Sequence, residues 1–354
     1  MTLDAILEPL PRCSDAVDAF LRASPFAAYQ QTLAWPAAIP GHQRRDWRLF
    51  TARDGKRIVG AAVVRETQLA MGAWLAMLPR GPIVHDPARF GAVLAALKPV
   101  LREAGCCSVR LGPRVRGRDL PDVAEAMRGA GYTPLPENEQ ALHQVTGIVW
   151  LDKPEADVLA GFKQRGRRAL RAAEKAGVTV RPVETEADLE RFQRLLDAFG
   201  AARPDYDRSG QPDARGQAAL IAATGGQMLL AERGAGVIGA HAWVRQADEA
   251  IWLSLATLDR DGASPAYPLL WAAMRGARAA GCIAYDLAGL PDEEPQDIGE
   301  RGRLQFKMAF APHRRQLPPA CELPLAPLRH SVLIGARSTY RAIRRWRSAR
   351  AAHA

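Results

Sequence analysis

Long apolar runs are absent from this chain of 354 residues. No window holds the roughly eighteen consecutive apolar residues that a membrane-spanning helix needs. The first residues, MTLDAILEPLPRC, lack a basic start followed by an apolar segment, so no signal peptide is expected. Both observations predict a cytoplasmic protein.

Cysteine is also scarce, with five residues in the whole sequence. They are Cys13, Cys106, Cys107, Cys282 and Cys321. Their number is odd and their spacing matches no zinc-binding pattern. Without a secretory signal, reduced thiols are expected.

Familiar catalytic motifs are missing too. The sequence has no Walker lysine loop, no GxGxxG, no HExxH and no GxSxG. The seven histidines are scattered, and none pairs with a cysteine or carboxylate at metal-binding spacing. His143 and His241 lie in strand-like apolar runs and are expected to be packed core or rim residues. The sequence therefore predicts neither a metal nor a cofactor.

Lysine is rare in a basic chain. The net charge is +10, yet only six of the 48 basic residues are lysines. The charge favours an anionic partner such as nucleic acid, a phosphorylated small molecule or a membrane. Arginine and alanine richness is equally typical of a GC-rich genome, so charge alone decides nothing. The exception is Lys307, which stands between Phe306 and Phe310 in GRLQFKMAF.

An internal repeat indicates how the chain is organised. The strand-like runs at 58–64 (IVGAAVV) and 237–244 (VIGAHAWV) each follow a glycine-containing turn. Alanine-rich helical runs then lead to AGCCSVRLG at 104–112 and AGCIAYDLAG at 280–289. The same order of two strands, helix and strand therefore occurs twice.

The repeat predicts two α/β domains with mixed sheets and packed helices. The first is expected at 1–150 and the second at 151–325. A basic helix or helix pair at 154–177 and an amphipathic helix at 184–200 are expected early in the second domain. The remainder, 326–354, is expected to form a basic helical tail. It is expected to pack on the first domain, with an anionic membrane or RNA as alternative partners.

Five pieces of the sequence resemble the Fem family, the aminoacyl-tRNA-dependent transferases that build interpeptide branches on peptidoglycan precursors. The pieces are SPFAAYQQTLAW, LPRGPIVHD, FKQRGRRALRAAEKAGV, AAGCIAYDLAGLPD and GRLQFKMAF, in this order between residues 24 and 310. The resemblance implies two tandem domains with the fold of the acyl-CoA N-acyltransferases, known as GNAT. No segment is long enough for the helical arm of some members, so the chain resembles the short, armless type.

The resemblance also implies a reaction. An acceptor amine would attack the ester that links an amino acid to tRNA, forming an amide without metal or coenzyme A. The partners would be aminoacyl-tRNA and a lipid-linked or nucleotide-linked peptidoglycan precursor, in the cytoplasm or at the inner face of the membrane. A cation near the developing oxyanion would help. Lys307 occupies the lysine position of the family's FK motif and is the predicted catalytic residue. The alternative is a lysine that extends to solvent at the end of an edge strand.

Further site residues follow from the same matches. Asp86, Arg203, Tyr206, Arg303 and Phe306 are predicted to bind substrate. Asp86 has an alternative role as a turn residue before Pro87, and the loop of Arg203 and Tyr206 has an alternative reading as a polar loop. Weaker phosphate or tRNA contacts are predicted for Arg167, Arg168 and Arg171. Tyr285 and Asp286 are expected to shape a sheet edge.

Two departures from the family pattern leave the acceptor open. Ala38 stands where short members have a lysine for the acceptor diphosphate, and Ala311 replaces a glycine after the FK motif. A small-molecule or peptide acceptor is therefore an alternative.

An N-acyltransferase that uses acyl-coenzyme A or an acyl carrier is a second alternative. The glycine-rich turn that cradles coenzyme A is missing from DRDGASPAYPLLW, which contains two prolines instead. A non-catalytic RNA- or membrane-binding scaffold is a third. The transferred amino acid and the oligomeric state are not predicted.

Overall fold

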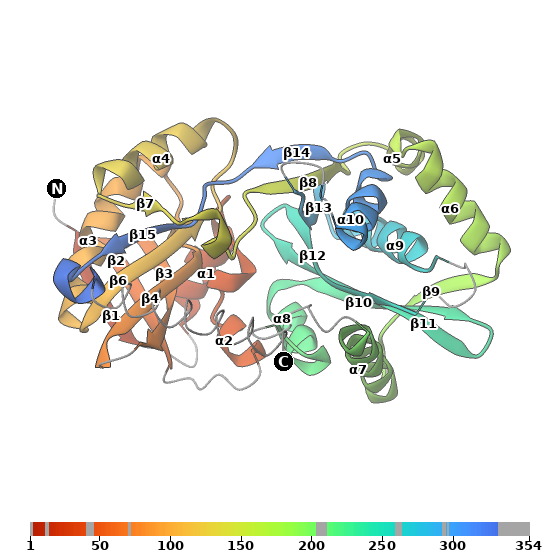
Figure 1. Ribbon diagram of the computed structural model, residues 1–354, viewed down its shortest axis with the longest axis horizontal. Coiled ribbons are helices and arrows are strands. Elements are labelled where there is room, and N and C mark those ends of the chain that lie inside the picture. The colour runs from red at the N-terminus through yellow and green to blue at the C-terminus, as the bar shows by residue number, and fades with distance from the viewer. Residues whose placement is uncertain are drawn as a thin grey trace, which may run out of the picture.

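The chain folds into two β-sheets that lie side by side, each with helices on its faces (Figure 1). The computed structural model describes residues 3–10, 14–39, 46–69, 72–202, 211–258, 264–291, 295 and 297–331. The predicted tail helix therefore lies largely outside the described residues, as do Arg203 and Tyr206. None of the helices within the described ranges is both long and apolar enough to cross a membrane.

The first sheet has eight strands, seven of them in the order β1-β2-β3-β4-β6-β15-β7. Their bounds are β1 (Asp4–Pro9), β2 (Trp47–Asp54), β3 (Arg57–Gln68), β4 (Trp74–Arg80), β6 (Cys106–Pro113), β15 (Cys321–Pro324) and β7 (Thr133–Pro134). The eighth strand, β5 (Ile83–Val84), pairs with β3. Alternate residues of β2 and β3 enter two cores, one on each face of the sheet. The helices are α1 (Asp15–Ala23), α2 (Trp35–Ala38), α3 (Phe90–Glu103) and α4 (Leu120–Gly129).

The second sheet has seven strands in the order β14-β8-β13-β12-β11-β10-β9. Their bounds are β14 (His313–Gln316), β8 (Val145–Trp150), β13 (Ala284–Gly289), β12 (Glu249–Thr257), β11 (Gly236–Gln246), β10 (Gly226–Arg233) and β9 (Val178–Pro182). The helices are α5 (Glu155–Gly161), α6 (Gln164–Lys175), α7 (Glu186–Ala201), α8 (Ala214–Thr224), α9 (Ala266–Ala279) and α10 (Ile298–Met308). Helices α9 and α7 cover opposite faces.

The predicted repeat of two strands, helix and strand corresponds to β2-β3-α3-β6 and β10-β11-α9-β13, and each unit also has a third strand that was not predicted, β4 in the first and β12 in the second. In both units the last strand runs parallel to the third. Gly60 lies beneath α3, where an added Cβ atom would come within 2.6 Å of Val93. Gly239 lies beneath α9, where an added Cβ atom would come within 2.8 Å of Leu269. The two glycines of the sequence repeat therefore permit the same close helix–sheet contact.

The two halves exchange one strand each. Strand β8 follows the first unit in sequence but pairs with β13 in the second sheet. Strand β15 follows the second unit but pairs with β6 in the first sheet, where its blue arrow lies beside orange strands (Figure 1). The predicted divisions at 150 and 325 therefore each leave one strand with the opposite sheet.

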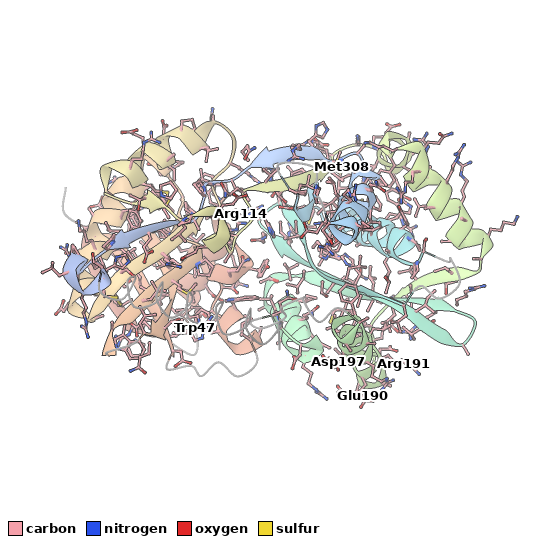
Figure 2. All side chains as sticks on the ribbon, in the orientation of Figure 1. Trp47, Arg114, Glu190, Arg191, Asp197 and Met308 are labelled. Atoms are coloured by element: carbon pink, nitrogen blue, oxygen red, sulfur yellow. The ribbon has the colours of Figure 1, made fainter. Side chains whose placement is uncertain are left out.

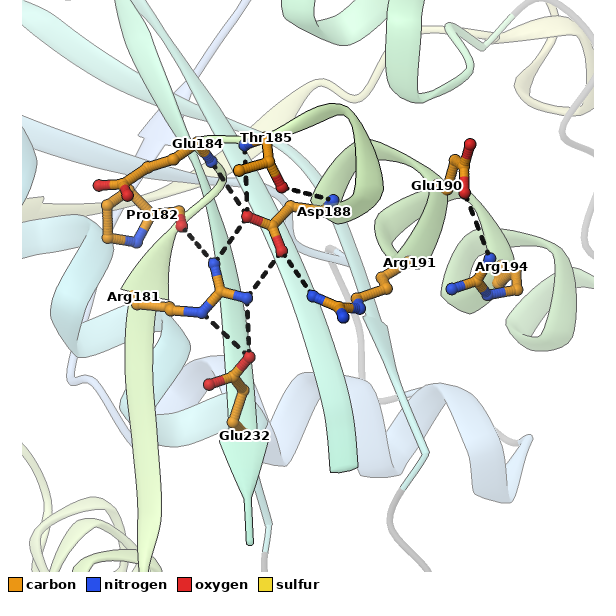
Figure 3. Close-up of polar contacts among 9 residues, drawn as sticks. All are labelled: Arg181, Pro182, Glu184, Thr185, Asp188, Glu190, Arg191, Arg194 and Glu232. Carbon is orange, nitrogen blue, oxygen red and sulfur yellow. Dashed lines mark hydrogen bonds and ion pairs between the residues drawn. The ribbon is translucent and has the colours of Figure 1, made fainter. Parts of the chain in front are cut away.

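A buried carboxylate begins α7 (Figure 3). Asp188 accepts hydrogen bonds from Arg181 at 2.8 and 2.7 Å, and from Arg191 at 3.0 Å. It also forms a reciprocal capping box with Thr185. The bond from Arg181 is the main cause that holds the pKa of Asp188 well below its usual value.

Asp188→Asn is expected to lower the free energy of unfolding by about 2 kcal/mol, because a charged acceptor of several hydrogen bonds is lost. Since the folded-state pKa is depressed, this stability is present above the usual value near 3.8 and disappears as the pH falls below it. Urea unfolding at pH 7 and pH 3 measures both effects. The control is Glu190→Gln, which removes an exposed ion pair with Arg194 at 3.9 Å. An equal loss in the control would contradict the prediction.

Candidate functional site

The second sheet opens between two of its strands. In the first sheet, β4 and β6 stay paired from Trp74 to Arg80. In the second, β12 and β13 are paired only from Glu249 to Ile251. Beyond Ile251 the two strands part, which leaves an opening between their carboxyl ends. Openings at the carboxyl ends of parallel strands are common binding sites in α/β proteins.

Lys307 lies at this opening. It belongs to the last turn of α10, so the alternative that placed it at the end of an edge strand is wrong. Its Nζ donates a hydrogen bond of 2.7 Å to the carbonyl of Gly289, the last residue of β13. The same Nζ lies 5.0 Å from the ring centroid of Trp252 on β12. The side chain therefore spans the gap between the parted strands.

The surroundings change the acidity of Lys307. Burial lowers its pKa to about 8, an effect that Asp286 opposes and Arg303 reinforces. A single ammonium group in a partly desolvated place interacts strongly with a nearby negative charge. The site thus supplies a cation that is also able to release its proton near neutral pH.

Aromatic rings form the wall behind Lys307. Phe306 packs edge-on against Tyr267, Trp252 and Phe310, at centroid distances of 4.9, 6.3 and 5.5 Å. Phe306 thus packs against the core of the second sheet, and its predicted contact with substrate stays a prediction. The rings hold the last turn of α10 in place and limit access of water from this side.

A hollow of about 170 Å³ adjoins Lys307. Arg303, Gly289 and Pro291 line it together with the lysine. Arg303 is exposed, with an ion pair of 3.4 Å to Glu300. The structure thus brings Lys307, Phe306 and Arg303 together, three of the residues predicted for the site.

Asp286 lies in the adjoining buried part of β13. Thr146 donates a hydrogen bond to it, and the backbone N–H of Ala288 donates another at 2.8 Å. The pKa of Asp286 is raised, mainly by burial. The β13–β8 pairing shifts register after Asp286, and Ala288 has a φ of 59°. This irregularity turns the end of β13 toward Lys307. Asp286 was expected only to shape the sheet edge, whereas its carboxyl group lies in the electrostatic field of the lysine.

Two residues from outside the second unit complete the surroundings, and neither was predicted to belong to the site. Arg80, at the end of β4, is 6% exposed and donates a 3.0 Å hydrogen bond to the carbonyl of His143. Its Nη1 atom has no hydrogen-bond partner among the described residues. His143 is exposed, and its ring lies against Gly289, where an added Cβ atom would come within 2.6 Å. For Arg80, the sequence signal that could have placed it at the site was its position at the end of the apolar strand that leads into LPRGP.

His241 and Tyr285 form a buried pair beneath Trp252. The Nε2 atom of His241 lies 2.6 Å from the Tyr285 hydroxyl, and its ring lies edge-on to Trp252. Burial lowers the pKa of His241 to about 3, so the ring is neutral. Its predicted role as a core residue is consistent with this position.

Ala311 adopts a backbone conformation that glycine favours, with a φ of 48°. This residue replaces the glycine of the related motif. An L-residue in the left-handed region carries a strain of about 1–2 kcal/mol. The turn after α10 therefore places an alanine in a conformation that a glycine would adopt without this strain.

Asp86 lies elsewhere. Its side chain accepts a hydrogen bond of 3.0 Å from the N–H of Ala88, as in its alternative role as a turn residue. It lines a hollow of about 520 Å³ that is formed entirely by the first half of the chain. No described hollow contains both Asp86 and Lys307.

The basic helix α6 starts beside the end of α10. The N–H of Lys163 donates a 2.9 Å hydrogen bond to the carbonyl of Ala309. Arg167 is turned inward and donates to the carbonyls of Ala160 and Phe162. Arg168 and Arg171 are exposed. The helix therefore offers some, but not all, of its predicted phosphate contacts to solvent.

The two halves meet through a buried ionic cluster. Glu249, at the start of β12, forms ion pairs with Arg114, Arg116 and Arg315. Glu249 is 1% exposed, and Arg114 lies between the two sheets (Figure 2). Burial alone would raise the pKa of Glu249, but the three arginines lower it. The cluster therefore ties the first half of the chain to the start of β12 in the second sheet.

Residues 160–307 match the model of the acetyltransferase (GNAT) domain family. No curated protein matches the sequence. The solved structure of FemX is similar to this chain with a TM-score of 0.77 and 16% identity, covering 93% of this chain and all of FemX.

Two other solved structures are similar to this chain at lower TM-scores. The structure of L-PGS from Bacillus licheniformis has a TM-score of 0.59 and 13% sequence identity, and the match covers 92% of this chain and 96% of the L-PGS chain. A tandem GNAT protein from the clavulanic acid biosynthesis pathway has a TM-score of 0.53 and 15% sequence identity, and the match covers 91% of this chain and 99% of the other chain. The predicted tandem GNAT-like fold is confirmed, and the chain has the same two-domain fold as FemX.

Proposed function

We propose that this chain is an aminoacyltransferase of the Fem type. It would move an aminoacyl group from aminoacyl-tRNA to an amine of a peptidoglycan precursor, in the cytoplasm or at the inner face of the membrane. The observation that carries the proposal is the position of Lys307 at the opening between β12 and β13, with its pKa lowered to about 8. The likeness in fold to FemX and L-PGS supports it.

The proposed reaction needs positioning and charge more than covalent catalysis. The acceptor nitrogen attacks the ester carbonyl, so a C–N bond forms and the C–O bond to the ribose breaks. The amine loses a proton and the ribose oxygen gains one. The Lys307 ammonium group is suited to stabilise the developing oxyanion and to protonate the leaving oxygen.

The tRNA would approach from the side of α6 and α10. Arg303 at the hollow and the exposed Arg168 and Arg171 offer positive charge to phosphates there. Contacts of this kind position a polynucleotide without reading its sequence.

One protein contact with the acceptor would differ from the family pattern. Ala38 is buried, and its carbonyl lies so close to Gly216 of α8 that a Cβ atom there would overlap it. No side-chain cation is available at position 38. The acceptor's negative charges must therefore be met by other residues.

A transfer assay tests the proposal. Labelled amino acids on a mixture of charged tRNAs are incubated with the protein and peptidoglycan precursors. The label is expected to move to a precursor amine, and prior RNase treatment is expected to abolish transfer. Free labelled amino acids serve as the control. Failure with every charged tRNA and every precursor would contradict the peptidoglycan proposal.

An N-acyltransferase that uses acyl-coenzyme A is a second candidate, favoured by the GNAT-family match. Pro265 and Pro268 stand at the start of α9 and have no N–H to offer a pyrophosphate. Tight binding of acetyl-coenzyme A in calorimetry, with no transfer from charged tRNA, would favour this candidate.

A further inference from the structure

A large pocket lies between the two halves of the chain. Its volume is about 780 Å³, within the range of sites for small molecules. Pro25, Phe26 and residues 116–120 line it from the first half, and residues from β8, β14 and the start of β12 from the second. It contains neither Lys307 nor any other residue of the hollow beside it.

Positive charge dominates the pocket. Its cationic side chains are those of Arg116, Arg118, Arg314 and Arg315, and His313 adds a ring that is able to bind a proton. Asp119 and Glu249 are the acidic residues among those that line it. Arg118 is exposed, and no hydrogen bond or ion pair of its side chain is found within the described ranges.

Two of the arginines that line the pocket, Arg116 and Arg315, belong to the ionic cluster around Glu249. Arg114, Arg116 and Arg315 all pair with the single carboxylate of Glu249. Their side chains are 6%, 21% and 14% exposed. The partly exposed Asp248 approaches Arg116 at 3.5 Å and offsets one further charge. Among the residues that line the pocket, four arginines face two carboxylates, and a bound anion would offset this excess of positive charge.

Part of the pocket lining is apolar. Phe26, Ile148 and Trp150 contribute to it, together with Ile283, which is 40% exposed. The guanidinium of Arg315 lies 5.7 Å from the ring centroid of Trp150. An aromatic surface beside arginines suits a ligand that combines phosphate with a flat or apolar group.

We propose that this pocket binds a ligand that carries two adjacent phosphate groups and a flat or apolar portion. The phosphates contact Arg118, Arg116 and Arg315, and the other portion packs on Trp150 and Ile283. The two sources of this chemistry are a pyrophosphate ester and the phosphodiesters of an RNA end. The proposal rests on the proposed function, since a nucleotide-linked or lipid-linked precursor and the end of a tRNA both carry this chemistry, but none of its contacts involves Lys307.

Arg314 connects the pocket with the site of Lys307. Its guanidinium donates a hydrogen bond to the carbonyl of Pro291, which lines the hollow beside Lys307. A ligand anchored in the pocket would therefore extend toward the opening of the sheet along one arginine side chain. This placement is compatible with either source of the phosphates.

Calorimetry with inorganic pyrophosphate, adenosine diphosphate and the trinucleotide CCA tests the proposal. At least one probe is expected to bind, and Arg118→Ser is expected to lower the affinity for that probe about tenfold or more. The matched control is Arg128→Ser, an equal change of charge on the exposed face of α4, which should leave binding unchanged. A second variant, Trp150→Leu, should lower the affinity for adenosine diphosphate more than the affinity for pyrophosphate.

The probes separate the two sources. Binding of pyrophosphate or adenosine diphosphate that depends on Arg118 supports a pyrophosphate ester. Dependence on Arg118 for CCA alone supports an RNA end. Absence of binding by all three probes, or equal weakening by Arg118→Ser and Arg128→Ser, would overturn the proposal. Measurement of circular dichroism confirms that each variant is folded.

Discussion

Replacement of Lys307 by methionine is expected to reduce aminoacyl transfer by about 100-fold or more, because a preorganised charge that stabilises the developing oxyanion is lost. Methionine keeps the length and apolar contacts of the lysine stem. The same variant is expected to be more stable at pH 7 by about 1–2 kcal/mol, since it removes a partly desolvated cation. Single-turnover transfer rates and urea unfolding measure the two effects.

The pH dependence distinguishes a functional lysine from a structural one. The ratio of the wild-type rate to that of Lys307→Arg is expected to fall as the pH rises through about 8, because Lys307 then loses its proton. Because titration of the acceptor amine affects both rates equally, it does not change their ratio. Stability should rise over the same range, toward the usual lysine value near 10.5, because the unfolded chain binds more protons there.

Lys175→Met is the matched control for the lysine. Lys175 is an exposed residue near the end of α6, so its replacement should alter neither the rate nor the pH profile. Unchanged transfer by Lys307→Met would remove the basis of the proposed mechanism.

Glu249→Gln is expected to produce the largest loss of stability, about 3–5 kcal/mol, because it leaves three arginines at the buried junction without their carboxylate. The difference in stability between the wild type and the variant should disappear in acid, because the wild type then loses the charge of Glu249. Since the pKa of Glu249 is lowered in the fold, its contribution is present above the usual value near 4.5 and disappears as the pH falls below it. The difference between wild type and variant should therefore shrink below pH 4.

Glu125→Gln provides the comparison. Glu125 is 72% exposed and pairs with Arg128 on the surface of α4, so its loss should change stability by less than about 1 kcal/mol. Guanidinium unfolding masks ionic effects, so urea is the appropriate denaturant. Similar losses from the two variants would show that the buried cluster makes no special contribution.

Much of the local structure followed from periodicity. The hydrophobic pattern of 186–199 predicted α7, and the glycine-containing turns predicted the hairpins of β3 and β11. Lys307 was found through its place in a family-like motif, although the motif did not reveal that it lies on a helix. Local patterns succeed here because they depend on neighbours within one turn or one hairpin.

The rest of the candidate site depends on contacts between distant segments. Arg80 and His143 reach the second sheet from outside its repeated unit, and Asp286 gains its environment from Thr146 on β8. Nothing in the sequence near β8 or β15 specifies which sheet each strand joins. The pairings of β8 with β13 and of β15 with β6 join segments that are far apart in the sequence.

The exchange of strands bears on synthesis of the chain. Strand β6 is complete at Pro113, yet its partner β15 begins only at Cys321. At 5–20 residues per second, the intervening stretch takes about 10–40 s to translate. Throughout that interval the edge of β6 has no strand beside it, and unpaired edges are templates for aggregation. The nascent first half is therefore the stage at which this protein most needs a chaperone.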